Sequence, residues 1–390
     1  MPAVSSSLTL TVVDDSDPLL GVLADVPAAP AALLETLAQV PDPRKPRGVR
    51  HRLAGVLAVT MAATLAGARS FVAIAEWAAD ATPEALARLG IAAAVPSEST
   101  IRRCLQRLAP DQLDRLVGAW MWLRTSTIGE RRVIAFDGKT LRGARDAAGN
   151  LTHLLAGLCQ RTGTVIAQIA VGAKTNEIPM LTKLLDTLDI AAAVITADAL
   201  HCQRGTAEYI VDRGGHYIFT VKDNQRKLRT QLKSLPWKQI PVLDSNTEHG
   251  HGRTAKRALK ATEIAQGIAF PHAVQVLQLT RTVTDRKTSK RHTETVYAVT
   301  SLAATDAHPR QIADWLRGHW HIENKLHWVR DVTYAEDHSQ IRTSGGPQVM
   351  ATLRNTVIGV LRLTGHDNIA AALRYHARDH HRPIKLLLNC

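Results

Sequence analysis

The spacing of apolar residues changes near residue 129, from the three- and four-residue steps of helices to the alternation typical of β-strands. Five strands are predicted after this point, at residues 131–140, 151–160, 164–172, 191–200 and 216–224. Helices are predicted between the last three of them, at residues 176–189 and 203–214. The first three strands can pair as hairpins, whereas the later two need crossovers through the helices. This order predicts a mixed α/β sheet.

The chain before this change is predicted to be helical. Leu53–Ala68 is a run of 16 uncharged residues, shorter than the roughly 20 that a membrane crossing needs, so a buried helix is the better interpretation. Ser97 is expected to cap a later helix with Glu98 in its first turn, from which Arg102 and Arg103 face outward. Either this helix reads DNA as part of a helix-turn-helix, or it is an ordinary charged surface helix.

The charge of the chain indicates its kind of partner. A net charge of +13 and a pI near 9.9 point to a polyanion, either nucleic acid or an anionic membrane. Nucleic acid is favoured, because the sequence lacks a sustained basic amphipathic helix. Arg44, Lys45 and Arg47 lie in a basic stretch interrupted by Pro and Gly, which either grips phosphate or forms a solvated loop.

The cysteines and the first residues bear on the cellular compartment. The four cysteines lie far apart and form no Cys-x-x-Cys pair, which argues against a zinc ribbon and against a disulfide framework. Asp14, Asp15 and Asp17 stand where a signal peptide would carry Lys or Arg, so no export is indicated. A cytoplasmic location is therefore expected.

The segment 315–342 combines polar and aromatic residues in an unusual way. It is predicted to begin as an α-helix, which places Glu323, His327 and Arg330 on one face at positions i, i+4 and i+7. Trp320 and Trp328 could stack on an unpaired base, but packing into the core is the favoured interpretation.

Three carboxylates are candidates for a metal-dependent site. Asp137 and Asp198 each stand where an apolar strand is predicted to end, the usual place for ligands in α/β sheets, although a single aspartate there is more often a turn-former. With Glu323 they supply hard oxygen ligands for Mg²⁺ or Mn²⁺, and two such ions can assist phosphoryl transfer. Lys139 and Arg142 follow Asp137 and are expected either to neutralise phosphate or to be simple surface charge.

Several blocks of the sequence resemble a known family. FDGKTLRG, ITADALH, YIFTVKDNQ and RGHWHIENKLHWVRDVTYAEDHSQIR look like blocks of bacterial insertion-sequence transposases of the DDE type, in the group that includes the H-repeat-associated proteins. The stretch that begins PDPRKPRGVRHRLAGVLAV resembles the helical domain associated with that group. The resemblance covers residues 33–365 and implies a ribonuclease-H-like catalytic core.

The resemblance and the periodicity together predict the domain boundaries. They are a flexible arm at 1–31, a helical DNA-binding domain at 32–128, the catalytic domain at 129–224 and 303–365, a β-rich insertion with a basic face at 225–302, and a basic tail at 366–390.

The resemblance also implies a function. Asp137, Asp198 and Glu323 match the triad of enzymes that nick the ends of a mobile element by metal-assisted hydrolysis and then join the freed 3′-hydroxyl to target DNA. Double-stranded DNA is the implied partner, bound by a homo-oligomer, and Lys222, His327 and Arg330 are further expected DNA contacts. A nuclease that never joins strands and a DNA-binding protein whose chemistry has lapsed remain alternatives.

The segment that contains Glu323, the third acid of the triad, departs from the wider family at two positions. His319 stands where Arg is usual, and Arg330 stands where Lys is usual. His319 replaces the missing charge only if its pKa is raised.

Overall fold

The computed structural model contains one nine-stranded sheet with the order β3-β2-β1-β4-β5-β9-β8-β7-β6. Its first five strands are β1 (Val133–Arg145), β2 (Leu151–Cys159), β3 (Thr164–Val171), β4 (Val194–Ala197) and β5 (His216–Val221). Strands β1, β2 and β3 pair antiparallel, whereas β4 is parallel to both β1 and β5. The predicted mixed sheet is confirmed, and its arrangement is ribonuclease-H-like.

The structure describes residues 32–390 except residues 48, 93, 127–130, 146–147, 173–174, 251 and 265–267. The predicted arm at 1–31 lies outside the described residues. Residues 32–390 form one compact unit.

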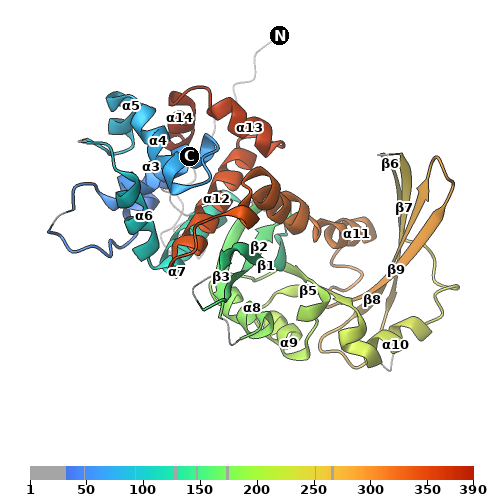
Figure 1. Ribbon diagram of the computed structural model, residues 1–390. Helices are drawn as coiled ribbons and strands as arrows, with labels where there is room; N and C mark the ends of the chain where they lie inside the picture. The colour runs from blue at the N-terminus through green and yellow to red at the C-terminus, as the bar shows by residue number, and fades with distance from the viewer. Residues whose placement is uncertain are drawn as a thin grey trace, which may run out of the picture. The chain divides into compact units, whose positions relative to one another are not determined.

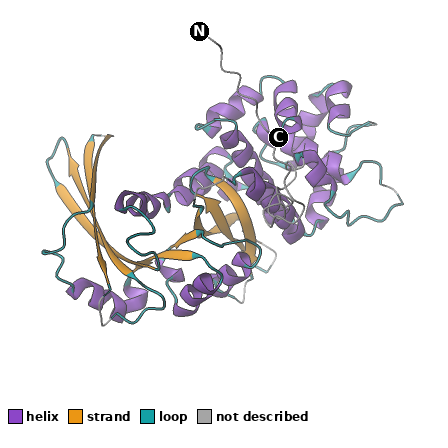
Figure 2. Cartoon of the chain, turned by 180° about the vertical axis from the view of Figure 1, so that it is seen from behind, coloured by secondary structure: helices purple, strands orange, loops and turns teal. Residues whose placement is uncertain are grey.

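The predicted insertion continues the sheet of the first five strands. After the short helix α10 (Arg226–Ser234), its strands are β6 (Asp244–Gly250), β7 (Arg253–Glu263), β8 (Gln275–Asp285) and β9 (Arg291–Thr300). Strand β9 pairs antiparallel with β5, and the remaining strands extend outward from it (Figure 2). Edge strands with free hydrogen-bonding groups accept such additions readily, so the insertion and the core share one sheet.

Two crossover helices connect the parallel strands, as the sequence predicts. They are α8 (Glu177–Leu185) and α9 (Arg204–Asp212). The Asn176 side chain caps α8 by accepting a hydrogen bond of 3.1 Å from the Ile178 N–H. Met180, Leu181 and Leu184 recur at helical spacing and are buried, which fixes α8 against the sheet.

The N-terminal part of the unit is helical. Its helices are α2 (Leu33–Ala38), α3 (Leu53–Leu65), α4 (Phe71–Asp80), α5 (Pro83–Arg88), α6 (Glu98–Arg107) and α7 (Pro110–Arg124). Helix α3 is apolar all round and is buried along almost its whole length, as predicted. No helix in the described part of the chain is long and apolar enough to span a membrane. Ser97 caps α6 as expected, with its hydroxyl accepting from the Thr100 N–H.

Helix α12 (Gly346–Leu363) joins the helical part to the sheet. It is buried from residue 346 to residue 361 and packs against α3, α6, α7 and strand β3 (Figure 1). The segment predicted as a basic tail forms two further helices, α13 (Ile369–His376) and α14 (His381–Leu388). Helix α14 packs on α2 and α3, and the Leu33 N–H donates to the Cys390 carbonyl over 3.3 Å.

The segment that carries Glu323 is only partly α-helical. Helix α11 (Pro309–Gly318) is followed by two π-helical turns, η3 (Ile322–His327) and η4 (Val329–Thr333), and a short 3₁₀ turn, η5 (Glu336–His338). The Trp328 N–H donates to the Glu323 carbonyl, five residues back, instead of four. A π-helix takes more residues per turn than an α-helix, so residues seven apart no longer share a face. The expected common face is therefore wrong for Arg330, which is buried, whereas Glu323 and His327 line one cavity.

Candidate active site

Asp137 and Asp198 lie side by side because of the register of two parallel strands. Phe136 of β1 pairs with Ala197 of β4, so the next residue of each chain segment is an aspartate. Strand β1 continues past Asp137 to Arg145, which corrects the expectation that a strand ends there; only the pairing with β4 ends at this point. Asp198 also caps η1 (Ala199–His201), with Oδ1 accepting from the Leu200 N–H over 2.9 Å.

Glu323 faces Asp137 across a cavity of about 560 Å³. The residues around it belong to β1, η3, η4 and η5 and to the positions that flank η3: Asp137, Gly138, Lys139, Thr140, Arg142, Trp320, Glu323, Asn324, His327, Trp328, Asp331 and Asp337. Burial raises the pKa of Asp137 to about 7, helped by the negative charges of Asp198, Glu177 and Glu323. The structure therefore places the three predicted acids in one electrostatic neighbourhood.

These acids are neighbours rather than a preassembled ligand set. Within the described residues, no group of three or more His, Cys, Asp or Glu side chains is arranged so that it could hold a metal ion. The chemistry of the donors nevertheless fits a divalent cation, because they are carboxylate oxygens whose mutual repulsion a cation would relieve.

His327 lies beside Asp137 and does not face solvent. Its Nδ1 is 3.5 Å from Asp137 Oδ2, and the residue is buried. Burial, together with the positive charges of Arg330 and Lys139, lowers the pKa of His327 to about 3. A buried neutral imidazole cannot act as a cationic phosphate contact, so this expectation for His327 is corrected.

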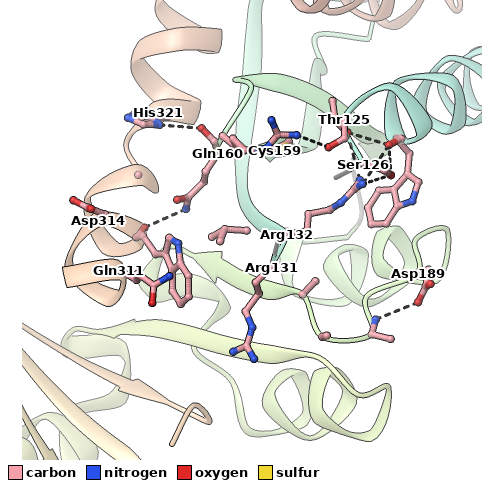
Figure 3. A pocket seen from close by; sticks show the side chains of 18 residues that line it. Thr125, Ser126, Arg131, Arg132, Cys159, Gln160, Asp189, Gln311, Asp314 and His321 are labelled. Atoms are coloured by element: carbon pink, nitrogen blue, oxygen red, sulfur yellow. Dashed lines mark hydrogen bonds between the residues drawn. The ribbon is translucent and has the colours of Figure 1, made fainter. Parts of the chain in front are cut away.

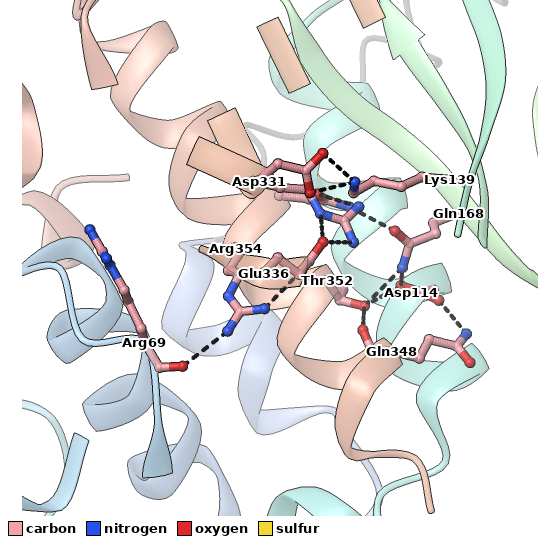
Figure 4. Close-up of polar contacts among 11 residues, drawn as sticks. Arg69, Asp114, Lys139, Gln168, Asp331, Glu336, Gln348, Thr352 and Arg354 are labelled. Atoms are coloured by element: carbon pink, nitrogen blue, oxygen red, sulfur yellow. Dashed lines mark hydrogen bonds and ion pairs between the residues drawn. The ribbon is translucent and has the colours of Figure 1, made fainter. Parts of the chain in front are cut away.

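Arg330 is fully buried, with 0% of its surface exposed. Its Nε donates to Glu336 Oε2 over 2.8 Å, and the other carboxylate oxygen, Oε1, accepts from Arg354 Nη1 over 2.8 Å. Arg354 in turn donates to the Arg69 carbonyl, in the helical part of the chain, over 3.1 Å (Figure 4). The π-helical turns direct Arg330 inward, so the predicted phosphate contact is replaced by an ion-pair network.

The same network reaches helix α7. Arg330 Nη1 lies 3.4 Å from Asn355 Oδ1, and Asn355 donates to Gln168 of β3 over 2.8 Å. Gln168 donates to Asp114 of α7 over 3.1 Å, and Thr352 of α12 donates to the same carboxylate (Figure 4). The segment after Glu323 is thus tied to the sheet and to the N-terminal helices by hydrogen bonds between buried groups.

The other basic residues predicted near the acids differ in availability. Lys139 is buried, and its Nζ lies 2.6 and 2.7 Å from the carboxylate oxygens of Asp331, so it is not free to contact phosphate as expected. Arg142 is exposed, with its Nε 3.8 Å from a carboxylate oxygen of Asp337. Lys222, directly after β5, is also exposed. Arg142 and Lys222 therefore remain candidate DNA contacts.

Trp320 and Trp328 do not have the environment that the sequence favours. Trp320 and Trp328 are 60% and 57% exposed and line the cavity of Asp137 and Glu323, so the expectation of core packing is wrong.

Burial lowers the pKa of His319 to about 4, and its Nδ1 is 3.3 Å from the Thr196 hydroxyl. His319 is thus uncharged at neutral pH and does not replace the charge of the usual Arg.

Sequence reasoning missed Glu177, the first residue of α8. Its carboxylate lies 2.8 Å from His153 Nε2 and 3.3 Å from His201 Nε2. These two hydrogen bonds, from His153 first, lower the pKa of Glu177 to about 2. An acidic residue in the first turn of a helix is common for electrostatic reasons alone, so the sequence contains no local signal for a role near Asp137.

The predicted basic stretch and helix α6 enclose one groove. Its volume is about 910 Å³, and its basic side chains are Arg44, Lys45, Arg47, Arg50, His51, Arg103 and Arg107. Arg102 is not among them and pairs with Glu98 over 2.9 Å. Residues from two segments about 55 positions apart thus contribute positive charge to one concave surface.

A further cavity, of about 780 Å³, lies at the beginning of β1 (Figure 3). Val133, Arg131 and Arg132 line it, and Gln160 donates there to the Trp315 carbonyl over 3.1 Å. None of the three candidate acids lines this cavity. It is therefore separate from the candidate active site.

Comparison with protein families decides the classification. A model described as the transposase DDE domain matches residues 128–359, and one described as DDE_Tnp_1-associated matches residues 34–121. The chain belongs to the DDE transposase family. The DDE domain match includes all three candidate acids, and the associated match includes the basic groove from Arg44 to Arg107.

Curated relatives agree with membership in the DDE transposase family. YbfL of Escherichia coli K12 is 30% identical over 362 residues, which cover 89% of this chain and 94% of YbfL. A second protein of the same strain, named "H repeat-associated putative transposase YhhI", is 29% identical over 362 residues, covering 89% of this chain and 94% of its own length. The resemblance to this group is confirmed.

Among solved structures, the cryo-EM structure of a piggyBac transposase synaptic complex with hairpin DNA is similar to this chain. The TM-score is 0.40 and the identity 13%, with 91% of this chain and 74% of that chain covered. Similarity at this level adds nothing to the assignment of function.

Proposed function

We propose that this DDE transposase cleaves DNA at the ends of a mobile element and joins the freed 3′-hydroxyl to target DNA. The reaction depends on Mg²⁺ or Mn²⁺ held by Asp137, Asp198 and Glu323. The observation that carries the proposal is the register of β1 and β4, which sets Asp137 beside Asp198, while Asp137 and Glu323 line one cavity. Carboxylates from rigid strands are well placed to hold a reacting phosphate in one geometry.

The residues present fit a divalent cation. Asp137, Asp198 and Glu323 would hold it through their oxygens, and in doing so Asp137 would give up the proton that its raised pKa retains. When bound, such ions activate the attacking oxygen and stabilise the leaving one during in-line phosphoryl transfer. The chain's own residues position the acids: β1 and β4 fix the aspartates, and the buried pair of Arg330 with Glu336 and the partly exposed pair of Lys139 with Asp331 hold the segment of Glu323.

Double-stranded DNA is the proposed partner. The groove that contains Arg47 and Arg103 offers concentrated positive charge to a phosphate backbone. Arg142 is exposed and lines the cavity of Asp137 and Glu323, and Lys222 is exposed directly after β5. We propose that Arg44 and Lys45 contribute to the same electrostatic attraction, and that Arg102 acts from outside the groove. A homo-oligomer is proposed because two element ends must be held together.

The test uses a supercoiled plasmid that carries the gene with its native flanking DNA. The purified chain with Mn²⁺ is expected to produce nicks at fixed positions on both sides of the gene and to insert the excised ends into a second plasmid. Nicks without insertion of a pre-nicked 3′-hydroxyl end would identify a nuclease instead. DNA binding with no metal-dependent product would identify a protein whose chemistry has lapsed.

A further inference from the structure

Glu177 connects strand β1, which carries Asp137, with the turn η1, which Asp198 caps. The residue starts α8, a helix that begins 40 positions after Asp137 in the chain, yet its carboxylate lies directly against the backbone of β1. A Cβ atom at Gly138 would be 2.4 Å from the carboxyl carbon of Glu177, a separation that real Cβ atoms do not show. Only a glycine at position 138 therefore permits this approach.

Two histidines hold the Glu177 carboxylate in this place. His153 belongs to β2, and its other ring nitrogen, Nδ1, lies 2.8 Å from the Thr140 hydroxyl of β1. His201 is 0% exposed and ends η1, the turn that Asp198 caps. One carboxylate thus contacts the strand of Asp137, its neighbour β2 and the turn after Asp198.

The charge of Glu177 acts on the same site. Glu177 is one of the negative charges that raise the pKa of Asp137, after Asp198 and before Glu323. It is partly buried, with 19% of its side chain exposed, so water screens this interaction only in part. Its position therefore combines contacts with β1, β2 and the turn after Asp198 with a negative charge next to the acids.

We propose that Glu177 is a positioning residue of the catalytic centre: held by His153 and His201, it keeps the backbone of Asp137 and the turn after Asp198 next to each other, so that both aspartates can reach one divalent cation. The proposal rests on the proposed function and adds to it a fourth acidic residue, outside the triad. Glu177 is not proposed to touch the reacting phosphate.

The test measures Mn²⁺ binding to the full chain by isothermal titration calorimetry, together with Mn²⁺-dependent strand cleavage. Glu177→Gln keeps the size of the side chain but removes its charge, and Mn²⁺ affinity is expected to fall about 10- to 100-fold, the usual effect of losing a partner of metal ligands. Glu177→Asp keeps the charge and should recover part of the loss. The exposed Glu208 on α9 supplies the matched control, because Glu208→Gln should leave Mn²⁺ affinity unchanged.

A second variant leaves Glu177 itself intact. Gly138→Ala places a methyl group where the carboxylate lies, so it should displace Glu177 and also weaken Mn²⁺ binding. The proposal would be overturned if Glu177→Gln folds and binds Mn²⁺ with wild-type affinity. If Glu177→Gln does not fold, wild-type affinity in Gly138→Ala would overturn it. Failure of Asp137→Asn to reduce Mn²⁺ binding would instead reject the metal site on which the proposed function depends.

Discussion

Replacing Asp137 by Asn should make the metal-free protein more stable above neutral pH. The pKa of this carboxyl is about 7 in the folded chain and 3.8 as an ordinary aspartate. Each pKa unit is worth about 1.4 kcal/mol, so ionising Asp137 costs the folded state about 4 kcal/mol. The physical origin is burial together with the charges of Asp198, Glu177 and Glu323. Asparagine has the same shape and carries no charge, so it removes this cost.

The sign of the effect depends on pH in a defined way. The pKa of Asp137 is higher in the folded than in the unfolded chain. As far as this carboxyl alone is concerned, the folded protein is therefore most stable at low pH, where the group is protonated in both states, and it loses stability as the pH rises toward 7. The advantage of Asp137→Asn should therefore be small near pH 4, increase through pH 5 and 6, and be complete above pH 7. Exposed Asp212, the last residue of α9, provides the control variant Asp212→Asn, which should show no such trend.

The assay is thermal unfolding by calorimetry in a chelating buffer between pH 4.5 and 8.5, repeated with excess Mg²⁺. At pH 8 without metal, Asp137→Asn should unfold several degrees above the wild type, and Mg²⁺ should raise the midpoint of the wild type much more than that of the variant. A variant that is less stable at pH 8, or a difference that does not change with pH, would refute the electrostatic account of this site.

Three further predictions concern the surroundings of the acids and the groove. Asp331→Ala leaves the buried Lys139 ammonium without its partner and should lower the free energy of unfolding by about 1–3 kcal/mol in urea denaturation, less than for a fully buried pair because the Asp331 side chain is 31% exposed. A loss well below about 1 kcal/mol would show that Lys139 finds water instead. His319→Gln should leave the pH profile of cleavage between pH 6 and 8 unchanged, because the low pKa keeps this imidazole neutral there; a lost acidic limb would contradict the burial argument. Arg103→Glu should weaken duplex DNA binding and reduce its dependence on salt, as measured by fluorescence anisotropy. Arg88→Glu, outside the groove, should have little effect on binding. Equal losses of DNA affinity in the two variants would show that the groove is not the DNA-binding surface.

The succession of strands and helices along residues 131–224 could be predicted because each of these elements has a local pattern. The apolar runs of β2, β3 and β4 between turn residues, and the helical stripe of α8, are readable from neighbouring residues alone. The continuation of the sheet through β9 could not be predicted, because the pairing of β5 with β9 joins residues about 80 positions apart.

Of the residues in the candidate active site, only the three acids could be predicted from the sequence. Asp137 and Asp198 adjoin apolar strands, a position that favours ligand sites. The π-helical turns after Glu323 could not be foreseen, since the same residues support an α-helix equally well, and they decide that Arg330 points inward. Glu177 was missed because its relation to Gly138 exists only in three dimensions.

The most direct test of the central claim is strand cleavage and joining by Asp137→Asn, Asp198→Asn and Glu323→Gln, measured with Mn²⁺ on DNA from the native flanks of the gene. The account predicts that each variant binds this DNA as the wild type does. The rates of cleavage and joining should fall by about 100-fold or more, because the transition state loses several kcal/mol of stabilisation by the metal ions. Cleavage at the wild-type rate by any one of the three would contradict it.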